Sequence, residues 1–289
     1  MNLTYLLYRL AGAILPKIPS TWGYRLCHWL GGILYQFNSQ HRANIRLNLR
    51  RIMGPQANQV EINRRARATF DTILYNYFDL FRLPSLDRRT VERLVTVTGW
   101  EHIEAALSKG RGLVMVSAHL GNIETVLYAM LLRGLSITIP VEHLEPPELF
   151  DYICTLRTSR GLKLVPIDGP LLDLIRTLRK GGVAGLAGDR DITGSGRIVN
   201  FFGHPAHLPD GHVRLALKTG APLMAAFSYR NPDHTYQAYF LPAFDPSPAA
   251  TEEERLVAGM SFVIAEMEKA ISQNPEQWTV TVPIWADKN

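Results

Sequence analysis

Hydrophobic positions from about residue 110 onward form short β-rich runs that alternate with amphipathic segments. Predicted strands cover residues 112–117, 137–141, 163–167, 182–187, 222–229, 236–242 and 278–282. Predicted helices cover residues 122–133, 147–160, 171–180, 208–219 and 251–273. This alternation is typical of an α/β fold whose sheet is parallel in its first half. The short turn at 229–234 joins two strands directly, so we expect a mixed, mainly parallel central sheet flanked by helices.

The first 82 residues show helical periodicity instead, with predicted helices at 3–15, 21–37, 39–53 and 60–82. The first two combine Trp, Tyr, Leu and Ile with scattered cations, the composition of a helix that lies in a membrane interface. An amphipathic cap packed on the core is the alternative. The uncharged stretch 26–41 is shorter than the roughly 20 apolar residues of a spanning helix. We therefore predict an N-terminal helical membrane-docking region at 1–58 and an α/β domain at 59–289.

Charge is distributed unevenly along the 289 residues, although the net charge of +5 conceals it. Residues 1–70 hold ten Lys and Arg against the single acid Glu61, a net charge of +9, which leaves −4 for the remainder. This asymmetry indicates an anionic partner for the N-terminal end, either nucleic acid or a membrane surface. A hydrophobic content of 46% excludes a disordered chain. Cys27 and Cys154 have no metal-binding spacing and predict free thiols in a reducing compartment.

The clearest chemical motif follows the first predicted strand and reads Val114-Met-Val-Ser-Ala-His119-Leu-Gly-Asn-Ile-Glu124. With His119 in the turn before a helix and Glu124 in its first turns, we expect the imidazole to fold back onto the carboxylate. Such a pair forms a general base with an orienting acid. Gly121 lets a substrate approach the backbone, and the helix start at Asn122 offers N–H donors to an anion. The alternative is a helix cap at His119 and a surface charge at Glu124.

Other candidate residues lie further along the chain. Arg157 suits a phosphate or sugar group of a lipid head, because a guanidinium binds such groups in a forked geometry. Asp189 and Arg190 follow an apolar strand, at the end where α/β sheets bind ligands. His204, His207 and His212 match no metal-site spacing, and we predict no metal.

Five motifs in order resemble those of one known superfamily. His119-Leu-Gly-Asn-Ile-Glu124 is similar to the His-x4-Asp/Glu motif of the lysophospholipid acyltransferases, in the branch of lipid A late acyltransferases and phosphatidylinositol mannoside acyltransferases. The further matches are Ala187-Gly-Asp-Arg-Asp191, Val199-Asn-Phe-Phe-Gly203, Thr219-Gly-Ala-Pro222 and Asn274-Pro-Glu-Gln-Trp278. The likeness covers about residues 40–289, and five ordered matches are far more specific than one.

The resemblance implies transfer of a fatty acyl group from acyl-CoA or acyl carrier protein to a hydroxyl of a phospholipid or glycolipid. It implies His119 as the base, Glu124 as its partner and no bound cofactor. It favours substrate-binding roles for Gly121, Asn122, Arg157, Asp189 and Arg190. We expect a peripheral or monotopic protein on the cytoplasmic face of the cell membrane, docked through residues 1–70 and without a nucleic-acid partner. The competing hypotheses are a non-catalytic lipid- or nucleic-acid-binding protein and an acyl thioesterase.

Overall fold

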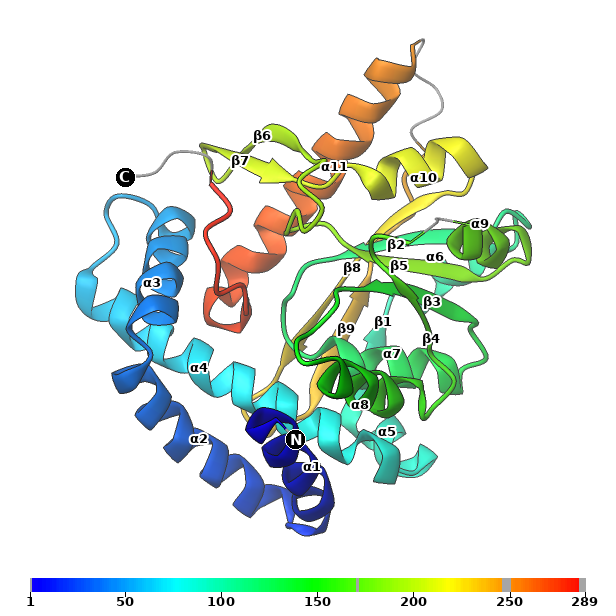
Figure 1. The fold of residues 1–289 in the computed structure, drawn as a ribbon. Coiled ribbons are helices and arrows are strands. Elements are labelled where there is room, and N and C mark those ends of the chain that lie inside the picture. The colour runs from blue at the N-terminus through cyan, green and yellow to red at the C-terminus, as the bar shows by residue number, and fades with distance from the viewer. Residues whose placement is uncertain (1, 170–171, 246–250, 286–289) are drawn as a thin grey trace.

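Helices form the whole N-terminal part of the chain in the computed structural model, which describes residues 2–169, 172–245 and 251–285. They are α1 (Leu3–Ile14), α2 (Ser20–Phe37), α3 (Ser39–Met53) and α4 (Gln59–Arg82), with a 3-10 turn, η1 (Leu15–Lys17), between the first two. In Figure 1 these blue to cyan helices lie along one side of the α/β part of the molecule. No helix in the described ranges is long and apolar enough to cross a membrane.

A central sheet organises the rest of the described chain. Its strand order is β1-β9-β8-β2-β5-β3-β4. The bounds are β1 (Val95–Thr98), β2 (Leu113–Ser117), β3 (Ile137–Val141), β4 (Lys163–Pro166), β5 (Val183–Ala187), β8 (Leu223–Arg230) and β9 (Tyr236–Phe240). Strands β8, β2, β5, β3 and β4 pair in parallel, whereas β9 runs antiparallel to β8. The predicted mixed, mainly parallel sheet is therefore confirmed.

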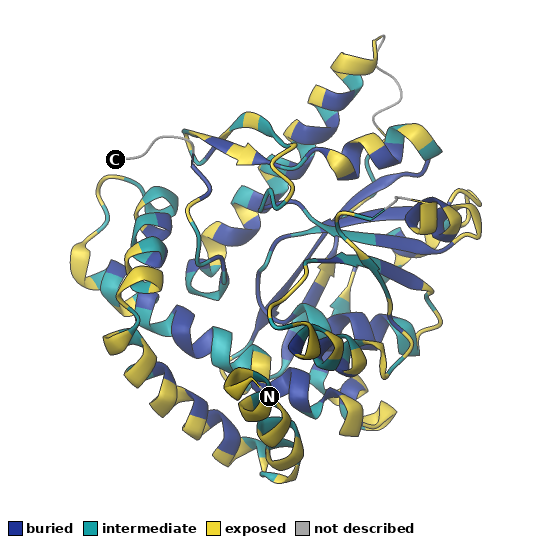
Figure 2. Cartoon of the chain, viewed as in Figure 1, coloured by how far each residue is buried: buried dark blue, intermediate teal, exposed yellow. Residues whose placement is uncertain are grey.

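Helices cover both faces of this sheet. They are α5 (Arg88–Leu94), α6 (Trp100–Leu107), α7 (Ile123–Leu132), α8 (Pro147–Thr158), α9 (Leu172–Arg179), α10 (Gly211–Thr219) and α11 (Glu252–Gln273), with 3-10 turns η2 (Leu83–Ser85) and η3 (Pro275–Gln277). Successive residues of a strand point to opposite faces. Val114 and Val116 therefore pack with α9, α10 and α11, whereas Leu113 and Met115 pack with α5, α6 and α7. Figure 2 shows the central strands as the buried layer between them.

Helix α2 packs on α4 through its small residues. Its buried positions are Gly23, Tyr24, Cys27 and Gly31, which recur at helical spacing. A Cβ on Gly23 would lie 2.0 Å from the Phe78 ring, and one on Gly31 would lie 2.3 Å from the Asp71 carboxylate. The two helices therefore approach closely at these glycines, and between them Tyr24 packs edge-to-face against Phe78 of α4.

Several elements differ from the sequence prediction. Helices α5 and α6, the short strand β1 and the hairpin of β6 (Arg197–Phe201) and β7 (His204–Leu208) were not predicted. The strand predicted at 278–282 is wrong, because this segment makes only an isolated bridge between Trp278 and Leu120. Its backbone instead contacts the turn after β2, where Thr279 N–H donates to the His119 carbonyl at 2.8 Å. Residues 170–171, in and beside one predicted helix, lie outside the described residues.

Candidate active site

Two neighbouring parallel strands bring His119 and Asp189 together. Ser117 at the end of β2 pairs with Ala187 at the end of β5, and each candidate residue lies two positions further along. The His119 Nδ1 is 2.8 Å from Asp189 Oδ1, and the His119 backbone N–H donates to Asp189 Oδ2 at 2.7 Å. An ionised carboxylate only accepts hydrogen bonds, so Nδ1 carries the proton and Nε2 is left as the basic nitrogen.

Asp189 is fully buried and held by a third donor, the Trp278 indole N–H, at 2.7 Å from Oδ2. Burial opposes ionisation of this carboxyl, but the charge of His119 and the hydrogen bonds from His119 and Trp278 outweigh it and lower the pKa of Asp189. The same carboxylate raises the pKa of His119 against the opposing effect of burial. The His119 side chain remains 37% exposed, so a substrate can reach it.

Glu124 does not pair with His119 as expected. It lies in the first turn of α7, and its Oε1 is 2.7 Å from Arg157 on α8. The imidazole turns the other way, toward β5, because Asp189 offers acceptors to both its ring and its backbone N–H. The structure thus corrects the expected contact: Asp189 occupies the place beside His119 that the motif spacing gave to Glu124.

Gly121 has a packing role that the sequence did not predict. Gly121 has a φ of +67°, and a Cβ there would lie 2.2 Å from the Ser228 carbonyl oxygen on β8. Its N–H donates to the Gln277 carbonyl at 3.1 Å, and its carbonyl accepts from the Asn76 side chain at 2.7 Å. Glycine is therefore required here by the close approach of the turn to the sheet, and both of its polar groups are already used.

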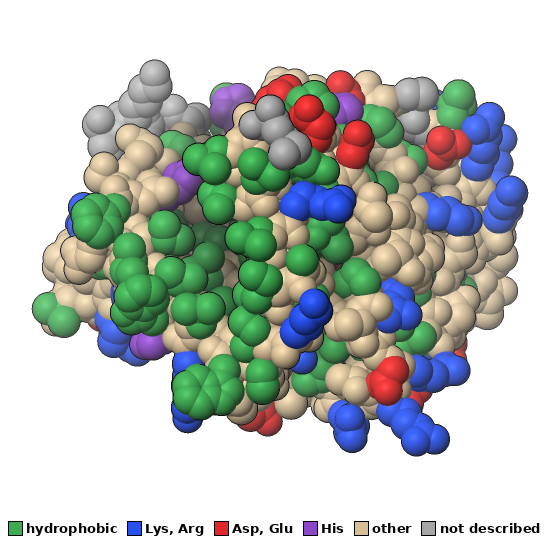
Figure 3. Space-filling view, turned by 60° about the horizontal axis from the view of Figure 1, so that its bottom comes forward, with side chains coloured by type: hydrophobic (Ala, Val, Ile, Leu, Met, Phe, Trp, Pro, Cys, Tyr) green, Lys and Arg blue, Asp and Glu red, His purple; other side chains and the backbone are tan. Residues whose placement is uncertain are grey.

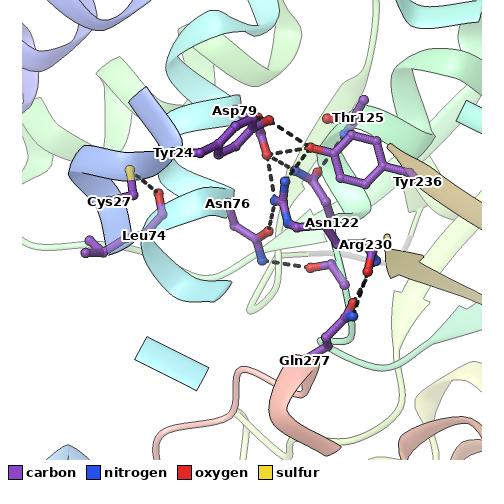
Figure 4. A network of polar contacts seen from close by, with 11 residues as sticks. Tyr24, Cys27, Leu74, Asn76, Asp79, Asn122, Thr125, Arg230, Tyr236 and Gln277 are labelled. Atoms are coloured by element: carbon purple, nitrogen blue, oxygen red, sulfur yellow. Dashed lines mark hydrogen bonds and ion pairs between the residues drawn. The ribbon is translucent and has the colours of Figure 1, made fainter. Parts of the chain in front are cut away.

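Asn122 is buried, with 1% of its surface exposed, and is the N-cap of α7. Its Oδ1 accepts from the Thr125 backbone N–H at 2.9 Å, and its Nδ2 donates to Asp79 at 2.9 Å (Figure 4). Both ends of the amide have partners inside the protein. The Asn122 side chain therefore supports the turn, and the predicted binding of an anion by N–H groups at this helix start stays a prediction.

Arg157 and Arg190 lie near the imidazole, since the charge of each lowers the pKa of His119 and so opposes the effect of Asp189. Arg190 also makes a forked pair with Glu142, at 2.8 and 3.1 Å. Arg190 and Glu142 line a cavity of about 370 Å³ together with Asp191, His207 and Trp285. The carboxyl ends of β2, β5 and β3 thus gather a base, a buried acid and two guanidinium groups.

Sequence reasoning missed the site contacts of Gln277 and Trp278. Trp278 bonds the buried acid, and Gln277 bonds Gly121. Both residues belong to the motif 274–278, which supported the family resemblance but was given no chemical role. The described residues hold no cluster of three or more His, Cys, Asp or Glu suited to a metal, and His212 is buried, with a pKa lowered by burial to about 4.

Comparisons with known proteins point in one direction. A family model described as bacterial lipid A biosynthesis acyltransferase matches residues 2–286. The phosphatidylinositol mannoside acyltransferase of Mycobacterium tuberculosis (strain CDC 1551 / Oshkosh) is 30% identical over 214 residues, which cover 72% of this chain and 66% of that protein. The alignment therefore spans slightly less than two thirds of that relative's own length.

A second relative aligns over more of the chain. The lipid A biosynthesis lauroyltransferase of Escherichia coli (strain K12) is 26% identical over 267 residues, covering 91% of this chain and 84% of that protein. Among solved structures, the 1-acyl-sn-glycerophosphate acyltransferase from Thermotoga maritima aligns with a TM-score of 0.38 at 15% identity, over 85% of this chain and 95% of that one.

Proposed function

Because the chain belongs to the bacterial lipid A biosynthesis acyltransferase family, we propose that it moves a fatty acyl group from a thioester donor to a hydroxyl of a membrane lipid. The observation that carries this proposal is the hydrogen bond between His119 and the buried Asp189, which leaves Nε2 as a base in a side chain that is partly exposed. The relatives are named for glycolipid substrates, phosphatidylinositol mannoside and lipid A, so we propose a phospholipid or glycolipid acceptor.

In the proposed reaction, His119 Nε2 takes the proton of the acceptor hydroxyl as its oxygen attacks the thioester carbonyl carbon. The Asp189 carboxylate keeps the proton on Nδ1 and stabilises the imidazolium that forms. The tetrahedral intermediate collapses as the C–S bond breaks. The imidazolium returns its proton to the leaving thiolate, so that an ester and a free thiol are released and the imidazole is neutral again. No group of the protein becomes acylated in this sequence.

The two guanidinium groups beside His119 suit the anionic parts of the substrates. We assign Arg157 and Arg190 to phosphate groups of the lipid head or of the donor, because guanidinium forks bind phosphate oxygens with several hydrogen bonds. Glu124 would orient Arg157, since the pair is largely buried and, among the described residues, the Glu124 Oε2 and the Arg157 Nε lack a partner. Acyl-CoA and acyl carrier protein both present a phosphate-bearing thioester and are the proposed donors.

Helices α1 and α2 present the surface that we propose to contact the membrane. Trp22 and Trp29 are 64% and 63% exposed, and Phe37 is 84% exposed. The exposed apolar residues of the two helices are Leu3, Leu6, Leu7, Leu10, Ile14, Trp22, Leu26, Trp29, Leu30, Ile33, Leu34 and Phe37. Such contiguous exposure at helical spacing is typical of an interfacial helix. Figure 3, which brings the bottom of Figure 1 forward, shows hydrophobic side chains gathered around a hollow.

Three cations of this region contact neutral groups of the protein. Arg9 and Arg25 lie over the rings of Tyr152 and Trp22, and Arg42 donates to two backbone carbonyls. These partners are neutral, so they leave a net positive charge beside the apolar residues. By contrast, Arg65 and Arg67 are paired with acids. The proposed docking surface is therefore narrower than residues 1–70, and it fits the anionic lipids of a cytoplasmic leaflet.

The test of the chemistry is product analysis with radiolabelled acyl thioesters. Purified protein would be mixed with acyl-CoA or acyl carrier protein donors, with and without vesicles that contain phosphatidylinositol mannoside or a lipid A precursor. We expect labelled lipid only when an acceptor is present. Release of free fatty acid at the same rate with and without acceptors would contradict the proposal and identify a thioesterase, which uses the same dyad.

The test of docking is cosedimentation with vesicles. We expect binding to vesicles that contain anionic phospholipid, and weaker binding at high salt. The double variant Trp22→Ser, Trp29→Ser should bind at least about tenfold more weakly, because inserting one large apolar side chain contributes roughly 1.5–3 kcal/mol. The matched control is Ile198→Ser, Val257→Ser, since these residues are 63% and 51% exposed and lie outside α1 and α2. Equal loss in both double variants would exclude the proposed surface.

A further inference from the structure

A buried ion pair lies behind the His119 turn, and the proposed chemistry does not use it. Asp79 on α4 and Arg230 at the end of β8 approach to 2.6 Å, with both side chains 5% exposed. The Asp79 carboxylate also accepts from the hydroxyls of Tyr24 and Tyr236, each at 2.6 Å, and from the amide of Asn122 (Figure 4). Four donors on one buried carboxylate form a network that links α2, α4, β8, β9 and the N-cap of α7.

Arg230 of this network also belongs to a closed ring of hydrogen bonds that passes through Asn76, Gly121 and Gln277. On one side, the Arg230 guanidinium donates to Asn76 Oδ1 at 2.9 Å, and Asn76 Nδ2 donates to the Gly121 carbonyl at 2.7 Å. On the other side, the Gly121 N–H donates to the Gln277 carbonyl. The Gln277 side chain then bonds both the backbone N–H and the carbonyl of Arg230, at 2.7 and 2.8 Å. Figure 4 labels Asn76, Arg230 and Gln277 and draws the bonds of Arg230 to Asn76 and to Gln277.

Gly121 is two positions from His119, the proposed base. Asn76 donates to the Gly121 carbonyl and Asp79 accepts from the Asn122 side chain, so α4 holds one end of the turn. Thr279 N–H and the Asp189 carboxylate hold the other end at His119. A shift of the turn would move the imidazole relative to Asp189, since His119 belongs to the turn and Asp189 follows the separate strand β5.

We propose that Asn76, Asp79 and Arg230 are positioning residues, which fix the turn 119–122 so that His119 stays aligned with Asp189. They act through Gly121 and Asn122 and do not touch a substrate. A purely structural role would only stabilise the fold, whereas a positioning role also sets the strength of the His119–Asp189 hydrogen bond. This inference rests on the proposed function for its kinetic consequences, but not for the state of the imidazole.

Asn76→Ala is the sharpest test. Removing either charge of the ion pair would leave the other buried without a partner and endanger the fold, whereas Asn76 is neutral. The matched control is Tyr229→Phe, which deletes one buried hydrogen bond, from the Tyr229 hydroxyl to the Ala270 carbonyl, away from the turn. Arg230→Lys is a second test, because a lysine keeps the positive charge beside Asp79 and loses the fork that reaches Asn76 and Tyr236.

Two readouts separate the roles. In NMR titrations of the full-length protein, we expect the pKa of His119 to fall in Asn76→Ala and Arg230→Lys and to stay unchanged in Tyr229→Phe. In acyl-transfer assays, the first two variants should lose between about 10- and 100-fold in kcat, with little change in KM for the thioester. An unchanged His119 titration, with activity that follows the folded fraction in all three, would overturn the proposal. Absence of acyl transfer in the wild type would refute the proposed function alone, since the titration needs no turnover.

Discussion

Gly121→Ala tests directly whether this glycine serves the packing of the turn or the approach of a substrate. Gly110 provides a matched control, because its φ of +71° is close to the +67° of Gly121, but nothing lies within 4 Å of a Cβ at Gly110. Alanine in this left-handed region costs roughly 1–2 kcal/mol at either site. At Gly121 the new methyl would also lie 2.2 Å from the Ser228 carbonyl oxygen, which belongs to the central strand β8.

An ordinary carbon–oxygen contact is about 3.3 Å, so the turn or the strand must move by roughly 1 Å. Overpacking of this kind adds about 1–3 kcal/mol, and a displacement of about 1 Å beside a reacting group costs on the order of 100-fold in rate. We expect Gly110→Ala to lose about 1 kcal/mol in urea unfolding and to keep its acyl-transfer rate. Gly121→Ala should lose roughly 2–5 kcal/mol and about 100-fold in kcat. Equal stability and activity in the two variants would refute the packing argument.

Three further substitutions separate the roles of the site residues. Asp189→Asn removes the charge that raises the pKa of His119, so the acid limb of the kcat/KM profile should move to lower pH by about one unit or more. In the same variant kcat should fall on the order of 10²–10⁴-fold. The control Asp173→Asn, at an exposed aspartate, should leave the profile unchanged. Glu124→Gln should raise the KM of the acceptor more than it lowers kcat, since Glu124 holds Arg157. A kcat loss and a pH shift equal to those of Asp189→Asn would instead make Glu124 the partner of His119. Trp278→Phe deletes one hydrogen bond to Asp189 and should lower kcat about tenfold. The control Trp100→Phe, which loses a bond to the Glu104 carboxylate on α6, should affect stability only.

The sequence predicted the elements that local periodicity determines. The strands at 137–141 and 236–242 and the helices at 39–53 and 251–273 agree with the structure within two residues at each end. The segment 278–282 has the β-rich sequence of a strand, but its backbone is bonded to the His119 turn instead of a neighbouring strand. That difference depends on a contact between residues about 160 positions apart, which local periodicity does not contain.

The sequence indicated which of the candidate residues come close in space, but not how they pair. His119, Asp189, Arg157 and Arg190 lie together, as their positions after predicted strands and on the following helix indicated. The choice of Glu124 as partner followed from closeness in sequence. The actual partner of His119 depends on strand order, since β5 lies beside β2 and β3 does not. The contacts of Gly121 and Asn122 were not predicted because Asn76 and Asp79, which bond them, come from a helix 40 or more residues earlier.

His119→Ala tests the central claim most directly, with His102→Ala as a control on α6. The measurement is transfer of a radiolabelled acyl group from its thioester to lipid acceptors in vesicles. Circular dichroism and vesicle cosedimentation would be recorded on the same samples. We predict that His119→Ala keeps its fold and its vesicle binding but loses at least about 10³-fold in transfer rate, and that His102→Ala transfers like the wild type. Undiminished transfer by folded His119→Ala would contradict the assignment of His119 as the base.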